Sequence, residues 1–203
     1  MFRAERDSRK GVAEMSRRVA LIGVLLATCV SGVHGVQLVN PSFEDPLDPN
    51  NPIQHLAAGW GMWGGWMNRE TGWVPVRSGR CIVGYHHFRI GETNTSGIFQ
   101  DVPDVPPGSV CTFRIFACED YRTYPQSVEV RIEPYGGGDP LAVRAYGAGD
   151  IQVNRWTELS VTATSIGRGI RVVLLAVPKQ TDPRDGALRF DDASLAVARA
   201  GGP

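Results

Sequence analysis

The feature that most limits how this chain can fold is a series of short segments in which apolar and polar residues alternate, separated by turns rich in glycine and proline. In residues 127–135, for example, Val128, Val130 and Ile132 alternate with charged residues. A period of two is typical of a β-strand with one buried face, because successive side chains point to opposite sides of a strand. No segment has the periodicity of a convincing amphipathic helix, so the sequence predicts an all-β fold.

The spacing of these segments predicts one antiparallel β-sandwich or barrel. Eight or nine strands are expected, at residues 36–43, 81–87, 97–105, 110–118, 127–135, 141–146, 156–164, 170–177 and 187–197. A chain of 203 residues, of which 42% are hydrophobic, is long enough for one domain with an ordinary core. We therefore expect a single domain over residues 36–197, followed by a disordered Ala/Gly tail at 198–203.

The first 35 residues predict a targeting segment rather than part of the domain. Basic residues follow Met15, and the apolar run at 19–30 is too short to span a bilayer. We expect translation to start at Met15, cleavage by signal peptidase to leave Val36 near the new N-terminus, and the mature chain to be secreted or held in the cell envelope without a transmembrane span. An uncleaved anchor helix and lipidation of Cys29 are the alternatives.

The charge balance argues against nucleic acid as a partner. The formal net charge is zero, and no basic stripe appears along the chain. A domain that binds DNA or RNA usually carries an excess of Lys and Arg, which neutralises phosphate groups.

Removal of the leader would leave Cys81, Cys111 and Cys118, an odd number of thiols. Cys111 and Cys118 lie on one predicted strand, which would place them on opposite faces and roughly 23 Å apart. They cannot form a disulfide with each other if that strand is unbroken. A bridge from Cys81 to one of them stays open, but we expect buried thiols. No spacing of Cys and His indicates zinc.

Several segments, taken in order, resemble the CenC-type carbohydrate-binding modules of families 4, 9 and 22, which have the galactose-binding-like jelly-roll fold. The resemblance covers residues 36–197 and rests on segments 40–44, 59–60, 78–79, 97–102, 107–108, 156–159 and 190–195. The resemblance implies a jelly-roll β-sandwich and the binding of a polysaccharide or oligosaccharide. It also assigns Trp60 to the core.

The resemblance further implies a structural calcium ion between the first and last strands. Glu44 and Asp191 would meet there, and carboxylates with backbone carbonyls suit a hard cation. Asp192 alternates to the other face, which favours Asp191 as the ligand. The alternative is that Glu44 caps a turn and Asp191 accepts hydrogen bonds from the backbone.

Sugar binding needs aromatic rings for the C–H faces of a pyranose and planar polar groups for its hydroxyls. The resemblance places such groups on a concave sheet face and its edge loops, where Arg114 and Phe116 would neighbour Arg131. The candidate residues are Trp63, Trp66, Trp73, Tyr85, His87, Phe116, Tyr121, Tyr124 and Arg131. The alternatives are that Glu129, Arg131 and Glu133 form solvated ion pairs and that the tryptophan loop packs against the sheet.

The sequence favours a protein without catalytic activity. Glu119 and Asp120 are the one dense pair of carboxylates outside the expected calcium site, and no motif of a hydrolase or nucleotide-binding enzyme is present. The expected function is therefore secreted, calcium-stabilised glycan binding, alone or with a partner enzyme. A structural jelly roll that contacts proteins of the cell envelope is the alternative, and a glycosidase or lyase is a more distant one.

Overall fold

The computed structural model describes residues 36–48, 50, 56–71, 75–86, 95–119, 127–147, 149–177 and 188–199. The predicted leader, and the candidate residues Trp73, His87, Tyr121 and Tyr124, lie outside these ranges. Within the described residues there is no α-helix. Accordingly, no helix in that part of the chain has the length and hydrophobicity needed to cross a membrane.

The described residues form ten β-strands. They are β1 (Gly61–Trp63), β2 (Met67–Thr71), β3 (Cys81–Tyr85), β4 (Ser96–Val102), β5 (Val110–Glu119), β6 (Ser127–Pro134), β7 (Ala142–Tyr146), β8 (Thr157–Thr164), β9 (Ile170–Val177) and β10 (Leu188–Ala198).

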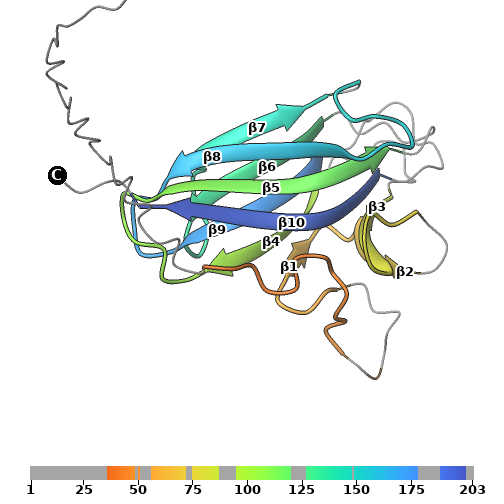
Figure 1. The fold of residues 1–203 in the computed structure, drawn as a ribbon, viewed down its shortest axis with the longest axis horizontal. Helices are drawn as coiled ribbons and strands as arrows, with labels where there is room; N and C mark the ends of the chain where they lie inside the picture. The colour runs from red at the N-terminus through yellow and green to blue at the C-terminus, as the bar shows by residue number, and fades with distance from the viewer. Residues whose placement is uncertain are drawn as a thin grey trace, which may run out of the picture. The chain divides into compact units, whose positions relative to one another are not determined.

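These strands make two five-stranded sheets, in the orders β2-β3-β10-β5-β8 and β1-β4-β9-β6-β7. We call them the front sheet and the back sheet, since the first lies nearer the viewer in Figure 1. Every strand pair within the sheets is antiparallel. The predicted all-β jelly-roll sandwich is therefore confirmed.

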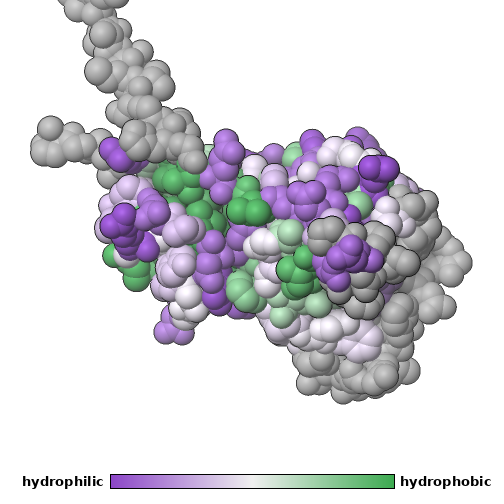
Figure 2. All heavy atoms as spheres, turned by 90° about the horizontal axis from the view of Figure 1, so that it is seen from below, coloured by the Kyte–Doolittle hydropathy of each residue, from purple (hydrophilic) through white to green (hydrophobic). Residues whose placement is uncertain are grey.

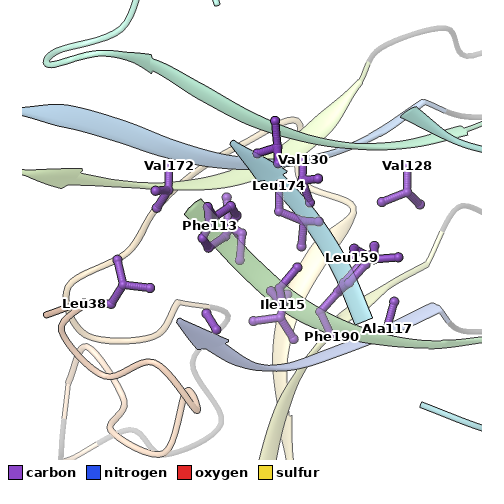
Figure 3. Close-up of a cluster of buried hydrophobic side chains, with 14 of the residues drawn as sticks. Leu38, Phe113, Ile115, Ala117, Val128, Val130, Leu159, Val172, Leu174 and Phe190 are labelled. Atoms are coloured by element: carbon purple, nitrogen blue, oxygen red, sulfur yellow. The ribbon is translucent and has the colours of Figure 1, made fainter. Parts of the chain in front are cut away.

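The core lies between the sheets and follows the predicted alternation. Phe113, Ile115 and Ala117 of β5 face Val128 and its alternate neighbours on β6, and all are fully buried. Leu174 of β9 joins the same cluster, which Figure 3 shows between the two layers. Trp60 is also in the core, as the resemblance implies. Burial of this apolar surface is the main source of stability.

Two hydrogen bonds connect the sheets along one side of the sandwich, where β7 of the back sheet approaches β8 of the front sheet. The hydroxyl of Tyr146 donates to the carbonyl of Ser160 (3.1 Å) and accepts the N–H of the same residue (2.8 Å). On the opposite side, residues 64–66 carry the chain directly from β1 in the back sheet to β2 in the front sheet.

The prediction of a strand at 36–43 is wrong. Asn40 and Phe43 have positive φ angles of 48° and 59°, which no extended strand contains. The Asn40 side chain donates to the carbonyls of Asp45 and Ala58 and holds a turn there. The segment still lies against the last strand, because the N–H of Ala193 donates to the carbonyl of Pro41 (2.8 Å).

The tryptophan-rich stretch at residues 59–73 is predicted as a loop. It contains the strands β1 and β2 instead. Each is short, and Gly61 in β1 with Gly64 and Gly65 in the connection to β2 hides the strand signal.

The three described cysteines are buried thiols, as expected, and none of them forms a disulfide. Burial raises the pKa of the Cys81 and Cys111 thiols, which makes them poor nucleophiles.

The surface seen from below mixes hydrophilic and hydrophobic residues, with the hydrophobic ones in small groups (Figure 2). The large hydrophobic side chains that are exposed, such as Val39, Leu47 and Ile166, belong to different segments. Scattered apolar residues of this kind are normal on a protein surface and mark no interface by themselves.

Phe190→Ala tests whether the core is packed as described. Phe190 is fully buried between the sheets, so its loss should reduce the free energy of unfolding by about 3–5 kcal/mol. Urea denaturation measures this change. Ile166→Ala, at a side chain that is 70% exposed, is the matched control and should change it by less than about 0.5 kcal/mol. Equal losses in the two variants would contradict the described core.

Candidate functional site

The outward face of the front sheet carries an unusual number of buried polar side chains. Alternation along the strands directs Glu70 of β2, Arg189 of β10 and Cys118 of β5 away from the core. Arg189 and Cys118 are nevertheless only 5% and 2% exposed. Outward positions on a sandwich are normally solvated, and charged residues are seldom buried unless paired. We call Glu70, His86, Cys118 and Arg189 the front-face cluster.

Glu70 and His86 are hydrogen-bonded within this cluster, between Glu70 Oε1 and His86 Nε2. Their side chains are only 9% and 12% exposed, respectively. The backbone N–H of His86 donates to the carbonyl of Trp66 (2.9 Å), which fixes the residue beside β2. The second carboxylate oxygen of Glu70, Oε2, is buried and has no hydrogen-bond partner. A buried acceptor without a hydrogen bond lowers the stability of the fold. A donor that reached Glu70 Oε2 would remove this cost.

Gly84 makes room for the Glu70 carboxylate. A Cβ atom at Gly84 would lie 2.5–2.6 Å from Cδ and both carboxylate oxygens of Glu70, closer than real contacts allow. Gly84 lies between Asn68 and Arg189 in the sheet register. Any larger residue there would displace the carboxylate, so the position of Glu70 depends on this glycine.

Phe116 lies next to the cluster on β5, beside Asp191 in the register. The guanidinium of Arg77 covers its ring at 3.6 Å from the centroid, a cation–π contact. Arg77 also forms an ion pair with Asp192 and remains about one-third exposed. Farther along this face, Arg114 and Glu158 form an open ion pair at 3.4 Å. The outward face of the front sheet therefore carries buried polar groups around Glu70, one aromatic ring at Phe116, and solvated charges at Arg114 and Glu158.

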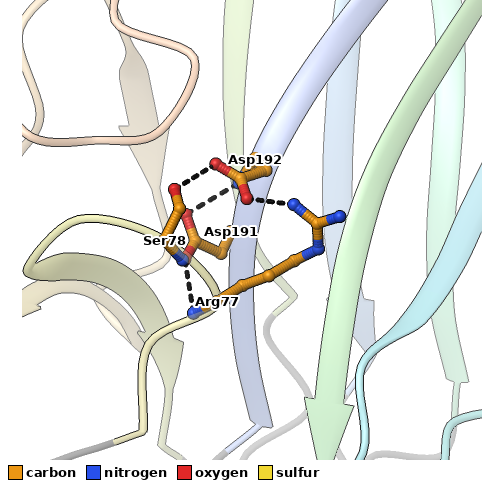
Figure 4. Close-up of polar contacts among 4 residues, drawn as sticks. All are labelled: Arg77, Ser78, Asp191 and Asp192. Atoms are coloured by element: carbon orange, nitrogen blue, oxygen red, sulfur yellow. Dashed lines mark hydrogen bonds and ion pairs between the residues drawn. The ribbon is translucent and has the colours of Figure 1, made fainter.

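Asp191 holds the loop that carries Arg77 (Figure 4). Its Oδ2 accepts the N–H groups of Arg77 (2.8 Å) and Ser78 (3.0 Å), and its Oδ1 accepts the N–H of Asp192 (2.8 Å). The Ser78 hydroxyl donates to Asp192 (2.6 Å). Burial raises the pKa of Asp191 to about 6, although the backbone donors at Ser78 and Arg77 lower it.

Glu44 holds the same loop from the other side. Its Oε1 accepts the N–H groups of Arg80 (2.9 Å) and Cys81 (3.0 Å). The buried Arg69 then ties this segment to β2, because it donates to the carbonyls of Phe43 (2.7 Å) and Glu44 (2.6 Å). We call Glu44, Asp191 and residues 77–81 the carboxylate clamp.

The carboxylate clamp does not fit the calcium site that the resemblance implies. Three of the carboxylate oxygens of Glu44 and Asp191 already accept backbone N–H groups, whose hydrogen atoms point at them. A cation would have to displace these donors. Within the described ranges, no three His, Cys, Asp or Glu side chains are grouped so that they could hold a metal ion. Calcium remains a prediction of the resemblance.

The structure separates several of the predicted ligand residues. Arg131 lies on the back sheet and Phe116 on the front sheet, so the expectation that they share a face is wrong. Tyr85 faces the core and is 1% exposed, which removes it from any outer surface and raises its pKa. Trp66 is partly buried and packs against the core, whereas Trp63 lies on the outward side of the back sheet.

The sequence did not reveal Glu70, His86 or Arg189. Their positions in β2, after β3 and in β10 become neighbours only through the sheet register. The one local signal was the outward position of Glu70 in the alternation of residues 67–71.

Comparison with known proteins finds the fold but no family. No family model and no curated protein matches the chain. A cyclase from Fischerella sp. TAU, in complex with 4-(1H-indol-3-yl)butan-2-one, is 17% identical with a TM-score of 0.59, over 81% of this chain and 98% of that one.

Carbohydrate-binding modules also share the fold. TmCBM61, in complex with β-1,4-galactotriose, is 15% identical with a TM-score of 0.53, over 78% of this chain and 95% of the module. The CBM22-1 xylan-binding domain of Paenibacillus barcinonensis Xyn10C is 14% identical with a TM-score of 0.51, over 79% of this chain and 93% of the domain. At such identities the likeness shows a shared jelly-roll fold and no more.

Thermal unfolding with and without calcium tests the carboxylate clamp. Backbone N–H groups already donate hydrogen bonds to three of the carboxylate oxygens, so we expect the same Tm in excess calcium and in excess chelator. Asp191→Ala should lower the Tm equally in both, because it removes three hydrogen bonds. A rise in Tm with calcium that Asp191→Ala abolishes would show that a cation binds there after all.

Proposed function

We propose that the protein binds an oligosaccharide or polysaccharide, without chemical turnover, on the outward face of the front sheet. The observation that carries this proposal is the Glu70 carboxylate, which is nine-tenths buried on an outward face and keeps one oxygen atom without a hydrogen-bond partner. A ligand hydroxyl that donates to this oxygen would replace a costly unsatisfied group with a charge-assisted hydrogen bond.

The groups around Glu70 suit a sugar. His86, Arg189 and Arg77 bring planar nitrogen-bearing groups to this face, and the apolar Phe116 ring, with the Arg77 guanidinium on it, lies two strands away from Gly84. Pyranose rings combine C–H faces with hydroxyls that both donate and accept, and therefore need both kinds of group. Carbohydrate-binding modules with this fold, one in complex with β-1,4-galactotriose and one that binds xylan, support this class of ligand.

Export of the protein belongs to the same proposal. It rests on the leader predicted at residues 1–35 and on the abundance of polysaccharides outside the cell. A structural calcium ion forms no part of it.

A second candidate is acid–base catalysis by the Glu70–His86 pair. A carboxylate and an imidazole in hydrogen-bond contact on an outward face are also what a proton-transferring enzyme needs, and a cyclase shares the fold. We favour binding because carbohydrate-binding modules with this fold take the class of ligand that suits Glu70 and its neighbours.

Glu70→Gln tests the proposal. We expect the wild-type chain to bind at least one member of a panel of β-1,4-galacto-, xylo- and cello-oligosaccharides. The variant should bind that ligand about 10–100-fold more weakly, because it loses a charge-assisted hydrogen bond worth about 1.5–3 kcal/mol. Isothermal titration calorimetry measures the affinities, and a reducing-end assay on the same samples should detect no product.

Asp104→Asn is the matched control, because it removes an ion-paired carboxylate that lies outside both sheets and should leave this affinity unchanged. Equal binding by wild type and Glu70→Gln would overturn the assigned site. Release of reducing ends would favour catalysis. Failure of a folded protein to bind any glycan would favour the structural role in the cell envelope.

A further inference from the structure

The Phe116 ring on the outward face of the front sheet is covered by another side chain of the protein. The Arg77 guanidinium lies 3.6 Å from the centroid of this ring. Figure 4 shows the Arg77 side chain extending from its loop across β10 toward β5, the strand that carries Phe116. A sugar that stacked on Phe116 would first have to displace the guanidinium. The ring therefore acts as a support for Arg77.

The loop that carries Arg77 does not depend on the Arg77 side chain. The backbone N–H groups of Arg77 and Ser78 donate to Asp191, and Glu44 accepts further N–H groups of the same loop. These bonds use backbone atoms, which any residue except proline would supply at position 77. The reach of the guanidinium across the sheet is therefore not required to hold the loop.

Around Arg77 the hydrogen-bond acceptors are filled and the donors are not. Asp192 accepts Arg77 Nη1 at one carboxylate oxygen and the Ser78 hydroxyl (2.6 Å) at the other. A guanidinium has five N–H donors, and within the described part of the chain the Arg77 guanidinium donates from Nη1 alone. Nε and Nη2 form an edge that can bind a carboxylate through two parallel hydrogen bonds.

The ion pair also presents its positive member to solvent. The Arg77 side chain is 36% exposed, whereas that of Asp192 is 20% exposed. Asp191, the other carboxylate beneath Arg77, is fully buried and accepts three backbone N–H groups. A ligand that approaches this place therefore meets a cationic, planar donor, which suits an anion better than a neutral hydroxyl.

Arg77 and Glu70 are too far apart on this face to bind the same sugar ring. Phe116 lies two strands across and two residues along from Gly84, against which the Glu70 carboxylate lies. At the usual strand spacing and rise, this separation is about 12 Å. A ligand that reaches both places has at least two rings, and its anionic group at Arg77 stays away from the Glu70 carboxylate.

We propose that the front face binds acidic oligosaccharides in preference to neutral ones, through a uronate carboxylate on the Nε and Nη2 edge of Arg77. A hydroxyl of another ring of the same ligand donates to Glu70 Oε2. The inference rests on the proposed function, because it names the class of glycan that the same face takes. Phe116 and Asp192 hold the guanidinium before the ligand arrives, which reduces the entropy lost on binding.

Calorimetric titration with matched pairs of ligands tests this preference. The pairs are xylotriose with and without a glucuronic acid branch, and trigalacturonate with and without methyl esters on its carboxylates. The full chain should bind the acidic member of at least one pair about tenfold more tightly or better, and added salt should reduce the difference. Arg77→Gln should remove the difference and leave the affinity for the neutral member unchanged. Arg77→Lys, which keeps the charge without the planar edge, should retain part of it.

Arg168→Gln is the matched control, because it removes an ion-paired guanidinium that lies outside both sheets and should leave the difference unchanged. Equal affinities for acidic and neutral members overturn the inference. Tighter binding of neutral sugars by Arg77→Gln also overturns it, since Phe116 would then be a stacking surface that Arg77 blocks. Tighter binding of a sulfated β-1,4-galactotriose than of either uronate would assign the anion to a sulfate ester and overturn the uronate.

The outcomes for Glu70→Gln separate this inference from the proposed function. Equal affinities within each pair, all weakened by Glu70→Gln, overturn the role of Arg77 and uphold the site at Glu70. A preference for the acidic member that Arg77→Gln removes and Glu70→Gln leaves at full affinity upholds Arg77 and overturns Glu70. If none of these ligands binds the folded wild-type chain, both are overturned.

Discussion

Two carboxylates, from opposite ends of the domain, hold one loop, and the geometry of the front sheet depends on them. Glu44 and Asp191 bind the backbone N–H groups of residues 77–81 from two sides. That loop leads directly into β3, which carries Gly84 and ends beside His86. The clamp therefore fixes the strand on which the position of Glu70 depends, and joins the start of the domain to its last strand.

The front and back faces use glycine in the same way and leave different chemistry exposed. Gly84 lets a carboxylate lie flat against the front sheet, while Gly61 and Gly97 let aromatic rings lie flat against the back sheet. Each arrangement places a functional group close to the backbone and shields one side of it. The front face therefore holds a buried hydrogen-bond acceptor, and the back face holds two aromatic rings.

The sequence predicted the jelly roll because alternation in segments such as 127–135 is local and strong. It failed at 36–43, where the Asn40 side chain holds a turn in place of a strand. It also failed at the tryptophan-rich stretch, where both strands are short and glycines lie in and after β1. It could not assign residues to sheets, because pairing is decided by register across long separations. For that reason Phe116 and Arg131 were expected on one face, and the pairing of Glu70 with His86 was missed.

The most direct test of the account is a crystal structure of the chain with the tightest-binding oligosaccharide of the panel. The account predicts a sugar on the outward face of the front sheet, with one hydroxyl within about 2.5–3.0 Å of Glu70 Oε2. It would be contradicted if the ligand were bound elsewhere while Glu70 Oε2 stayed buried without a donor.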